Sequence, residues 1–432
     1  MTVAVGFPRR PLHGTALWAS HVARWIPALM LAYGMLIWPL IYGRSVDGGP
    51  PVQILQNESS ALSQIYFPFL LVVSAFTWIA TRYGRGSPIA SGAIFVIALV
   101  IALSNLSVLW SIAPEIALRR AILQTAIVAT LILSVQAADD PDGVVARIFW
   151  LLVAIMAVNL AAIAMKGPGP LGYEGVYPQK NGLGAAASLA IIVALYQLFS
   201  GRPITRVVAC GTIVLAMFLL VLSKSKTSFG LVLLVPCLAL GIAVAARVMQ
   251  VSAATLIATM LAIAFAVYQL GVASYVWDFS TVAEALFGDP TLTTRTDIWD
   301  FAMRMAERRP LLGYGFESFW QAGPESPAAR EAPGFIARMP HAHNGYIDIL
   351  LQLGMVGLGL VIVMQFAAFG AADAALRRRF GLGWLCLCLM LLAGLRNFME
   401  SSWFRGFDMF SMIFVIMVAL AASIRERRSW NT

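Results

Sequence analysis

Long apolar segments separated by short polar links dominate the pattern of this chain. Twelve of them come close to the length of about 20 residues that crosses the hydrocarbon core of a bilayer. We therefore predict an all-α polytopic membrane protein with about twelve transmembrane helices, forming a single integral membrane domain over residues 1–432. The predicted spans are approximately 25–43, 62–81, 89–110, 116–136, 144–165, 182–200, 204–222, 228–246, 251–275, 344–370, 381–399 and 406–424.

One polar stretch is long enough to form structure outside the membrane, and it occupies residues 276–342 between predicted spans nine and ten. Apolar residues of this loop recur at helical spacing on one face: Ile298, Phe301, Ala302 and Met305. This pattern predicts an amphipathic helix that Pro310 ends. A weaker amphipathic piece, about 328–339, is broken by Pro333. A helix of this kind is typical of a lid that rests on the bilayer surface.

The amino-acid composition agrees with a membrane protein, and this affects how the net positive charge is interpreted. Hydrophobic residues make up 60% of the chain and charged residues only 12%, whereas soluble proteins carry roughly 25% charged residues. On a soluble protein the net charge of +9 would suggest a nucleic-acid partner, but here we predict none. We assign the basic residues to loops that set topology or hold anionic lipid-linked ligands. Their distribution predicts cytoplasmic termini and places the 276–342 loop outside.

Several cations stand at helix ends on the predicted outer face, where the positive-inside rule disfavours them. A charge within the membrane costs roughly 3 kcal/mol. Interfacial snorkelling explains any one of these residues, but the set predicts an anion-binding site. Its members are Arg119, Arg120, Lys180, Lys224 and Lys226.

Two of the four histidines stand where the outer loop meets the tenth predicted span. An imidazole has a pKa near neutrality, so His343 is a candidate general base. It is equally a candidate cation for a phosphate group, and the sequence leaves both roles open. We expect His341 to be a neighbour without a chemical role. Glu400 and Arg405, in the last outer loop, are candidates to orient His343 or bind an acceptor, with a structural ion pair as the alternative.

Four segments resemble bacterial O-antigen ligases and the ligase and polymerase superfamily around them. His343-Asn344, nine residues and Gly354-Met-Val-Gly357 match the ligase pattern of His, then Asn, Ser or Gln, nine residues, Gly, two residues and Gly, Thr or Tyr. Arg295-Thr-Asp-Ile-Trp299, followed by Pro310-Leu-Leu-Gly-Tyr-Gly315, resembles a superfamily run. Two shorter segments also resemble the superfamily, although the second usually carries Arg where this chain has Lys: Pro178-Gln-Lys-Asn-Gly182 and Ser223-Lys-Ser-Lys-Thr227.

The resemblance implies a lipid-linked glycosyltransferase of the GT-C type. It would move a finished polysaccharide from undecaprenyl pyrophosphate to a sugar hydroxyl of lipid A–core, at the periplasmic face of the bacterial inner membrane. Its partners would be this donor, this acceptor and membrane lipids. His343 and Arg295 would be catalytic, and Asn344 would be a candidate to orient them or to bind the acceptor. The five outer cations would bind the pyrophosphate, since charge grows on that leaving group in the transition state. Displacement in a single step would invert the anomeric carbon.

No cofactor is predicted, and no cluster of His, Cys and carboxylates has the spacing of metal ligands. The cysteines all fall inside apolar segments, so we interpret them as small buried hydrophobes without a disulfide or metal role. They are Cys210, Cys237, Cys386 and Cys388. Gly354 and Gly357 are expected to allow close helix packing.

Three alternatives to the ligase differ in what the protein acts on. A polysaccharide polymerase of the same superfamily takes a sugar chain as acceptor, and a protein O-oligosaccharyltransferase takes Ser or Thr. A transporter would show inverted repeats with broken, charge-bearing helices near the middle of the membrane, and the sequence has no such repeat. The long outer loop and the His-Asn…Gly-x-x-Gly match favour the ligase.

Overall fold

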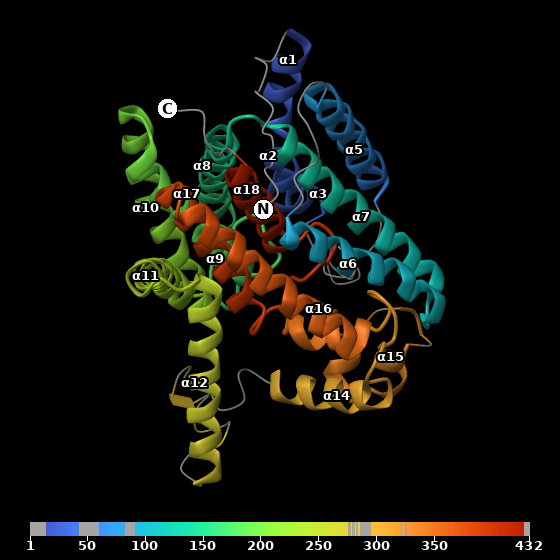
Figure 1. Cartoon of the computed structure of the whole chain (residues 1–432). Helices are drawn as coiled ribbons and strands as arrows, with labels where there is room; N and C mark the ends of the chain where they lie inside the picture. The colour runs from blue at the N-terminus through green and yellow to red at the C-terminus, as the bar shows by residue number, and fades with distance from the viewer. Residues whose placement is uncertain are drawn as a thin grey trace, which may run out of the picture.

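The structure is a computed structural model. It describes residues 14–42, 60–82, 91–274, 278, 281, 284–285, 295–320, 322–324 and 326–426. Its helices in chain order are α1 (Gly14–Ala23), α2 (Ile26–Ala32), η1 (Tyr33–Ile37), α3 (Trp38–Tyr42), α5 (Ala61–Arg82), α6 (Gly92–Leu106), η2 (Ser107–Trp110), α7 (Pro114–Ala137), α8 (Pro141–Lys166), α9 (Lys180–Ser200), α10 (Pro203–Ser223), α11 (Lys226–Met249), α12 (Ala253–Ala273), α14 (Arg295–Arg308), α15 (Pro327–Glu331), η3 (Gly334–Arg338), α16 (Gly345–Leu376), α17 (Phe380–Arg396) and α18 (Met409–Glu426) (Figure 1).

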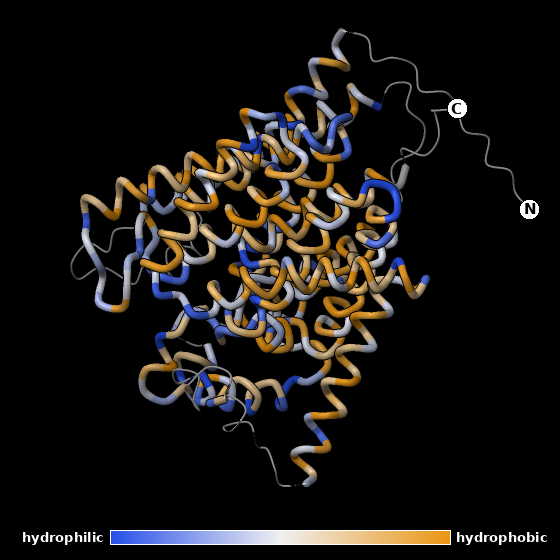
Figure 2. The backbone as a smooth tube through the Cα atoms, turned by 90° about the vertical axis from the view of Figure 1, so that its left-hand side faces the viewer, coloured by the Kyte–Doolittle hydropathy of each residue, from blue (hydrophilic) through white to orange (hydrophobic). Residues whose placement is uncertain are grey.

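The predicted all-α polytopic architecture is confirmed. Among the described residues, ten helical segments are long and apolar enough to cross a membrane, and the shorter apolar helices α17 and α18 match the last two predicted spans. The first segment runs over Gly14–Tyr42, longer than the predicted 25–43, because α1, α2, η1 and α3 follow one another closely. Figure 2 shows hydrophobic positions along the helices and hydrophilic ones mainly at helix ends and links.

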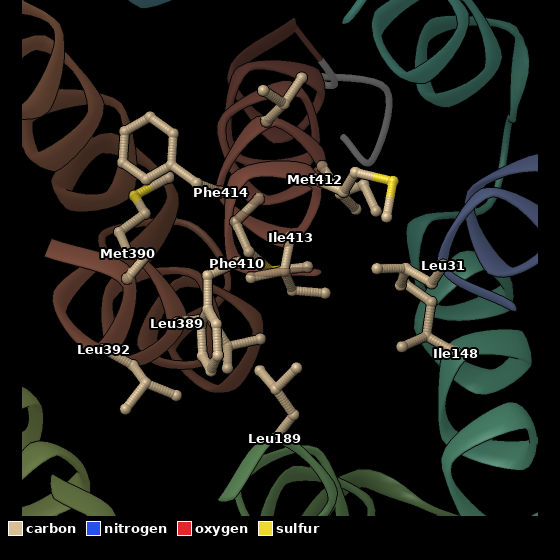
Figure 3. Close-up of a cluster of buried hydrophobic side chains, with 14 of the residues drawn as sticks. Leu31, Ile148, Leu189, Leu389, Met390, Leu392, Phe410, Met412, Ile413 and Phe414 are labelled. Atoms are coloured by element: carbon tan, nitrogen blue, oxygen red, sulfur yellow. The ribbon is translucent and has the colours of Figure 1, made fainter. Parts of the chain in front are cut away.

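Helix α18 forms the centre of the hydrophobic core. Every residue from 410 to 424 is buried, as expected for a helix that is apolar all round. Figure 3 shows its side chains surrounded by Leu31 of α2, Ile148 of α8, Leu189 of α9 and Leu389 of α17. The link between α17 and α18 is therefore held at one end of the tightly packed core.

Helices α10, α11 and α12 lie at the periphery of the bundle. Only 6% of the apolar window of α12 is buried, against 28% for α10 and 33% for α11, and α12 runs away from the other helices in Figure 1. Their outer apolar surfaces suit contact with lipid. Cys210 on α10 and Cys237 on α11 are consequently exposed, so the expectation that all four cysteines are buried is wrong for these two. Cys386 and Cys388 on α17 are buried.

Polar contacts also hold together the end of the bundle that the sequence assigns to the cytoplasm. The Arg24 guanidinium contacts the Asp139 carboxylate at 2.5 Å. Asp142 binds both Arg379 and the Tyr196 hydroxyl, each at 2.7 Å. The predicted topology assigns these residues to one side of the membrane, and the fold brings them together. Which side faces the cytoplasm stays a prediction, and residues 1–13 and 427–432 lie outside the described part of the chain.

The predicted amphipathic helix is present as α14, and its buried residues include the four predicted ones. They pack with Tyr314, Phe319 and Trp320 and with Leu351 of α16, so this face rests on the protein itself. In Figure 1, α14 lies alongside α16. The second predicted piece appears as α15 and η3, separated at Ala332 and Pro333. The proposed loop boundary at residue 276 lies outside the described residues.

Helix α16 is interrupted at Gly354, whose φ of 64° and ψ of −165° are not helical. The segment 310–315 runs beside the break and forms hydrogen bonds with the backbone groups that the break leaves unpaired inside the helix. Tyr314 N–H donates to the carbonyl of Leu351 at 2.8 Å, and Met355 N–H donates to the carbonyl of Pro310 at 2.8 Å. A Cβ at position 354 would lie 2.2 Å from the Leu311 carbonyl carbon and oxygen. Because Gly354 has no side chain, the backbone of the 310–315 segment can approach α16 closely there. The sequence had instead predicted close packing of two helices at this glycine.

Replacing this glycine tests whether the break is required. Gly354→Ala is expected to lower stability by about 1–3 kcal/mol, because alanine disfavours this backbone conformation and its Cβ would overlap Leu311. The measurement is the apparent melting temperature of the protein in lipid nanodiscs. Gly359→Ala is the matched control on the same helix, because a Cβ there meets nothing within 4 Å. Equal melting temperatures for the two variants would contradict this account.

Candidate functional site

The carboxylate of Glu400, in the link between α17 and α18, joins three distant segments of the chain. Its Oε1 accepts from Asn181 Nδ2 at 2.9 Å and from Arg295 Nη2 at 3.2 Å. Its Oε2 lies 3.2 Å from His343 Nδ1. The Glu400 side chain is 12% exposed. The first turns of α9 and α14 and the loop before α16 therefore meet at one buried charge.

The partners of Glu400 keep it ionised. Burial by itself raises the pKa of this carboxyl, but the hydrogen bond and charge of His343, with Arg396 and Arg295, more than reverse that effect and bring the pKa to about 2. A carboxylate only accepts hydrogen bonds, so Nδ1 of His343 carries a proton. In the neutral imidazole, Nε2 then holds the free lone pair. A base oriented by a carboxylate at its other nitrogen is well suited to take a proton from a hydroxyl.

His343 is held in a left-handed backbone conformation with φ of 53°, which costs free energy for any residue except glycine. Its N–H donates to Nδ1 of His341 at 3.1 Å, and the two ring centroids lie 4.1 Å apart. Burial, together with the positive charge of Arg405, His343 and Arg295, lowers the pKa of His341 well below its usual value. His341 is therefore neutral, and it holds the backbone of His343.

The residues on either side of His343 are also fixed. Ala342 N–H donates to Asp348 Oδ1 at 3.1 Å, and the Ala342 carbonyl accepts from Trp299 Nε1 at 2.9 Å. Asn344 caps α16, because its side chain accepts from the N–H groups of Tyr346 and Ile347. The catalytic candidate thus sits on a loop whose position is set by α14 and α16.

The predicted cations do not gather at one point. Arg295 contacts Glu400 directly, whereas Arg120 donates to the backbone carbonyl of Glu317 and lines a small separate void with Arg405. Arg119 is exposed and its Nε lies 3.4 Å from a carbonyl of its own helix.

The three predicted lysines lie around Asn181. Lys180 begins α9 and is half-buried beside Asn181. Lys224 and Lys226 are exposed on either side of Ser225, whose hydroxyl donates to Asn181 Oδ1 at 3.2 Å. The lysine segments are therefore tied to Glu400 through Asn181.

A cavity of about 140 Å³ adjoins Glu400. Its walls come from the first span, the 177–182 segment and the 396–409 link, with His341 at one edge. This volume exceeds that of a single water, about 30 Å³. Arg405 lines the cavity and makes no ion pair with Glu400 within 4 Å in the described residues. Glu400 instead forms an ion pair with Arg295, and its role in orienting His343 or binding an acceptor stays a prediction.

Sequence reasoning did not single out four residues of the site. Asn181 and Ser225 lie in segments that resemble the superfamily, so the sequence pointed to these segments but assigned no role to the two residues. Asp348 is a carboxylate near the start of an apolar span, which is costly and usually marks a special position. Arg396 is a buried arginine at the end of α17. In the described residues, no group of three His, Cys, Asp or Glu side chains is arranged to hold a metal ion.

The chain is similar in sequence to known proteins. Residues 211–362 match a family model described as O-antigen ligase, and this range includes Ser225, Arg295 and His343. The chain is also 26% identical over 274 residues to the exopolysaccharide production protein ExoQ of Rhizobium meliloti (strain 1021). The alignment covers 61% of this chain and 62% of that protein, which is less than two thirds of the relative's length.

The low pKa of Glu400 predicts how stability depends on pH. In the folded protein its pKa is about 2, against an ordinary value of 4.5, so its stabilising effect is complete above about pH 4.5 and is lost as the pH falls toward 2. Glu400→Gln is expected to be less stable than the wild type at pH 6 and to lose less stability between about pH 5 and 3. Apparent melting temperatures in nanodiscs measure both effects.

Glu115→Gln, which changes an exposed carboxyl at the start of α7, is the control and should follow the wild-type curve. Parallel curves for Glu400→Gln and the wild type would show that Glu400 is not the carboxylate concerned.

Proposed function

Because this chain belongs to the O-antigen ligase and polymerase superfamily, we propose that it transfers a glycan from undecaprenyl pyrophosphate to a sugar hydroxyl. The observation that carries the proposal is the contact of one ionised carboxylate, Glu400, with both His343 and Arg295. This arrangement supplies an oriented base and a cation side by side, as glycosyl transfer from a pyrophosphate requires.

In the proposed reaction, the acceptor hydroxyl approaches Nε2 of His343. The nitrogen takes the hydroxyl proton while the oxygen attacks the anomeric carbon of the donor sugar. The bond from that carbon to the pyrophosphate oxygen breaks on the opposite face, and undecaprenyl pyrophosphate leaves with the bonding electrons. The anomeric configuration is inverted. Glu400 stabilises the imidazolium that forms, and Arg295 stabilises the charge on the leaving group. The protein's own cations supply this stabilisation, so the proposed transfer is independent of metal.

For the acceptor, we propose lipid A–core, which makes the protein an O-antigen ligase acting at the periplasmic face of the inner membrane. The description of the matched family and the His343-Asn344…Gly354-x-x-Gly357 segment support this choice. The exopolysaccharide relative supports a second candidate, in which a growing polysaccharide is the acceptor and the protein is a polymerase. The two candidates share the donor chemistry.

Variants of the two catalytic candidates test the mechanism. His343→Ala and Arg295→Ala are each expected to lower transfer by about 10²-fold or more, because a positioned base alone contributes about 10²–10⁴-fold. The measurement is transfer of lipid-linked glycan to acceptor by purified protein in nanodiscs. Arg304→Ala, on an exposed side chain of the same helix as Arg295, is the matched control. The assay should also retain activity in excess chelator; loss that added metal restores would refute the metal-free mechanism.

Deleting the gene separates the two acceptors. A ligase deletion should leave lipid A–core without O-antigen while undecaprenyl-linked polymer of normal length accumulates. A polymerase deletion should instead remove long polymer from the lipid carrier. The second result would reject the ligase and favour the polymerase. Unchanged surface and carrier-linked glycans would reject both.

A further inference from the structure

Two arginines that line the cavity beside Glu400 make no ion pair within 4 Å in the described residues. Arg396 ends α17 and is 8% exposed, and Arg405 lies nine residues further along the same link. Both line the cavity. In the described residues, no hydrogen-bond acceptor is within reach of Arg396 Nε or Arg405 Nη2, although both atoms are inaccessible to solvent. Buried charged donors are normally paired, since leaving them unpaired is costly.

The carboxylates of the same cavity are already engaged by other groups. Glu400 accepts from Asn181, Arg295 and His343. Asp408 Oδ1 accepts from the N–H groups of Phe410 and Ser411 at 2.8 and 3.2 Å, which caps the start of α18.

Neither carboxylate lies within 4 Å of Arg396 or Arg405 among the described ion pairs. The Arg396 guanidinium instead lies 4.7 Å from the ring centre of Phe410, a contact that leaves its in-plane N–H groups free.

None of the five predicted pyrophosphate cations is among the residues that line this cavity. Lys224 and Lys226 are exposed, and Arg120 donates to the backbone carbonyl of Glu317. The two arginines of the α17–α18 link therefore provide the cationic surface here. A guanidinium presents a planar fork of donors that matches carboxylate and phosphate oxygens.

We propose that Arg396 and Arg405 form an anion subsite that binds a phosphate or carboxylate group of the substrate next to the Glu400–His343 pair. This inference rests on the proposed function for the nature of the substrate. The cavity of about 140 Å³ has room for one such group. Two sources share the chemistry: the pyrophosphate of the lipid-linked donor and an acidic sugar of either glycan. By binding this group, the subsite selects which substrate is held next to His343.

Direct binding to the full chain in nanodiscs tests the subsite without any transfer. The probes are inorganic pyrophosphate and glucuronate, titrated by calorimetry into the wild type, Arg396→Gln, Arg405→Gln and Arg396→Lys. Each Gln variant is expected to raise the dissociation constant of the bound probe at least about tenfold. Arg396→Lys should recover part of the binding, because it keeps the charge but loses the fork. Arg304→Gln, on an exposed side chain of α14, is the matched control and should bind like the wild type.

Binding of pyrophosphate that depends on the arginines identifies the donor as the source, and arginine-dependent binding of glucuronate identifies an acidic sugar. Wild-type affinity in both Gln variants would overturn the proposal, as would failure of the wild type to bind either probe. Melting temperatures confirm that each variant is folded, and Arg405→Gln keeps the test valid if Arg396→Gln does not fold. The proposed transfer is judged separately by the His343→Ala assay, so the two proposals can fail independently.

Discussion

The pairing of buried backbone groups at the break in α16 is the constraint on which the rest of the site depends. Buried N–H and carbonyl groups need partners, and the glycine at 354 leaves several without one inside the helix. The segment 310–315 provides those partners. Because that segment directly follows α14, its docking also fixes where α14 lies. One set of backbone hydrogen bonds therefore fixes the position of α14 relative to α16. Arg295 begins α14, and His343 lies just before the residue that caps α16, so these bonds also fix where the two side chains lie.

Electrostatics then concentrates at a single carboxylate. Glu400 accepts from an amide, a guanidinium and an imidazole that lie up to 219 residues from it in the chain. Breaking such a buried group of charges by removing one member leaves the others unpaired, which is far more costly than the net worth of the assembled set. The arrangement also fixes a tautomer, since only one nitrogen of His343 faces the carboxylate. The same carboxylate thus holds three segments of the chain together and sets which nitrogen of His343 carries the proton.

Much of the fold was predictable because it follows from local periodicity. Apolar run length identified the spans, and helical spacing identified the buried face of α14. His343, Arg295 and Glu400 came from local motifs and from their place in the topology. The break at Gly354 was not predictable, because glycines three residues apart in an apolar run equally suit close helix packing. The contact of Asn181 with Glu400 leaves no local signal. An arginine at a helix end, such as Arg396, looks the same in sequence whether it snorkels outward or is buried.

Arg295 has two attachments, and their combination has a thermodynamic consequence. It is the first residue of α14, whose apolar face rests on α16, and it is also a partner of Glu400. The docking of α14 on α16 and the contact of Arg295 with Glu400 are therefore thermodynamically coupled. Any ligand that binds more tightly when Arg295 is in place stabilises the docked helix by the same free energy, and any change that loosens the helix weakens that ligand equally. The order of an outer helix and the affinity of the buried site are two measures of one equilibrium.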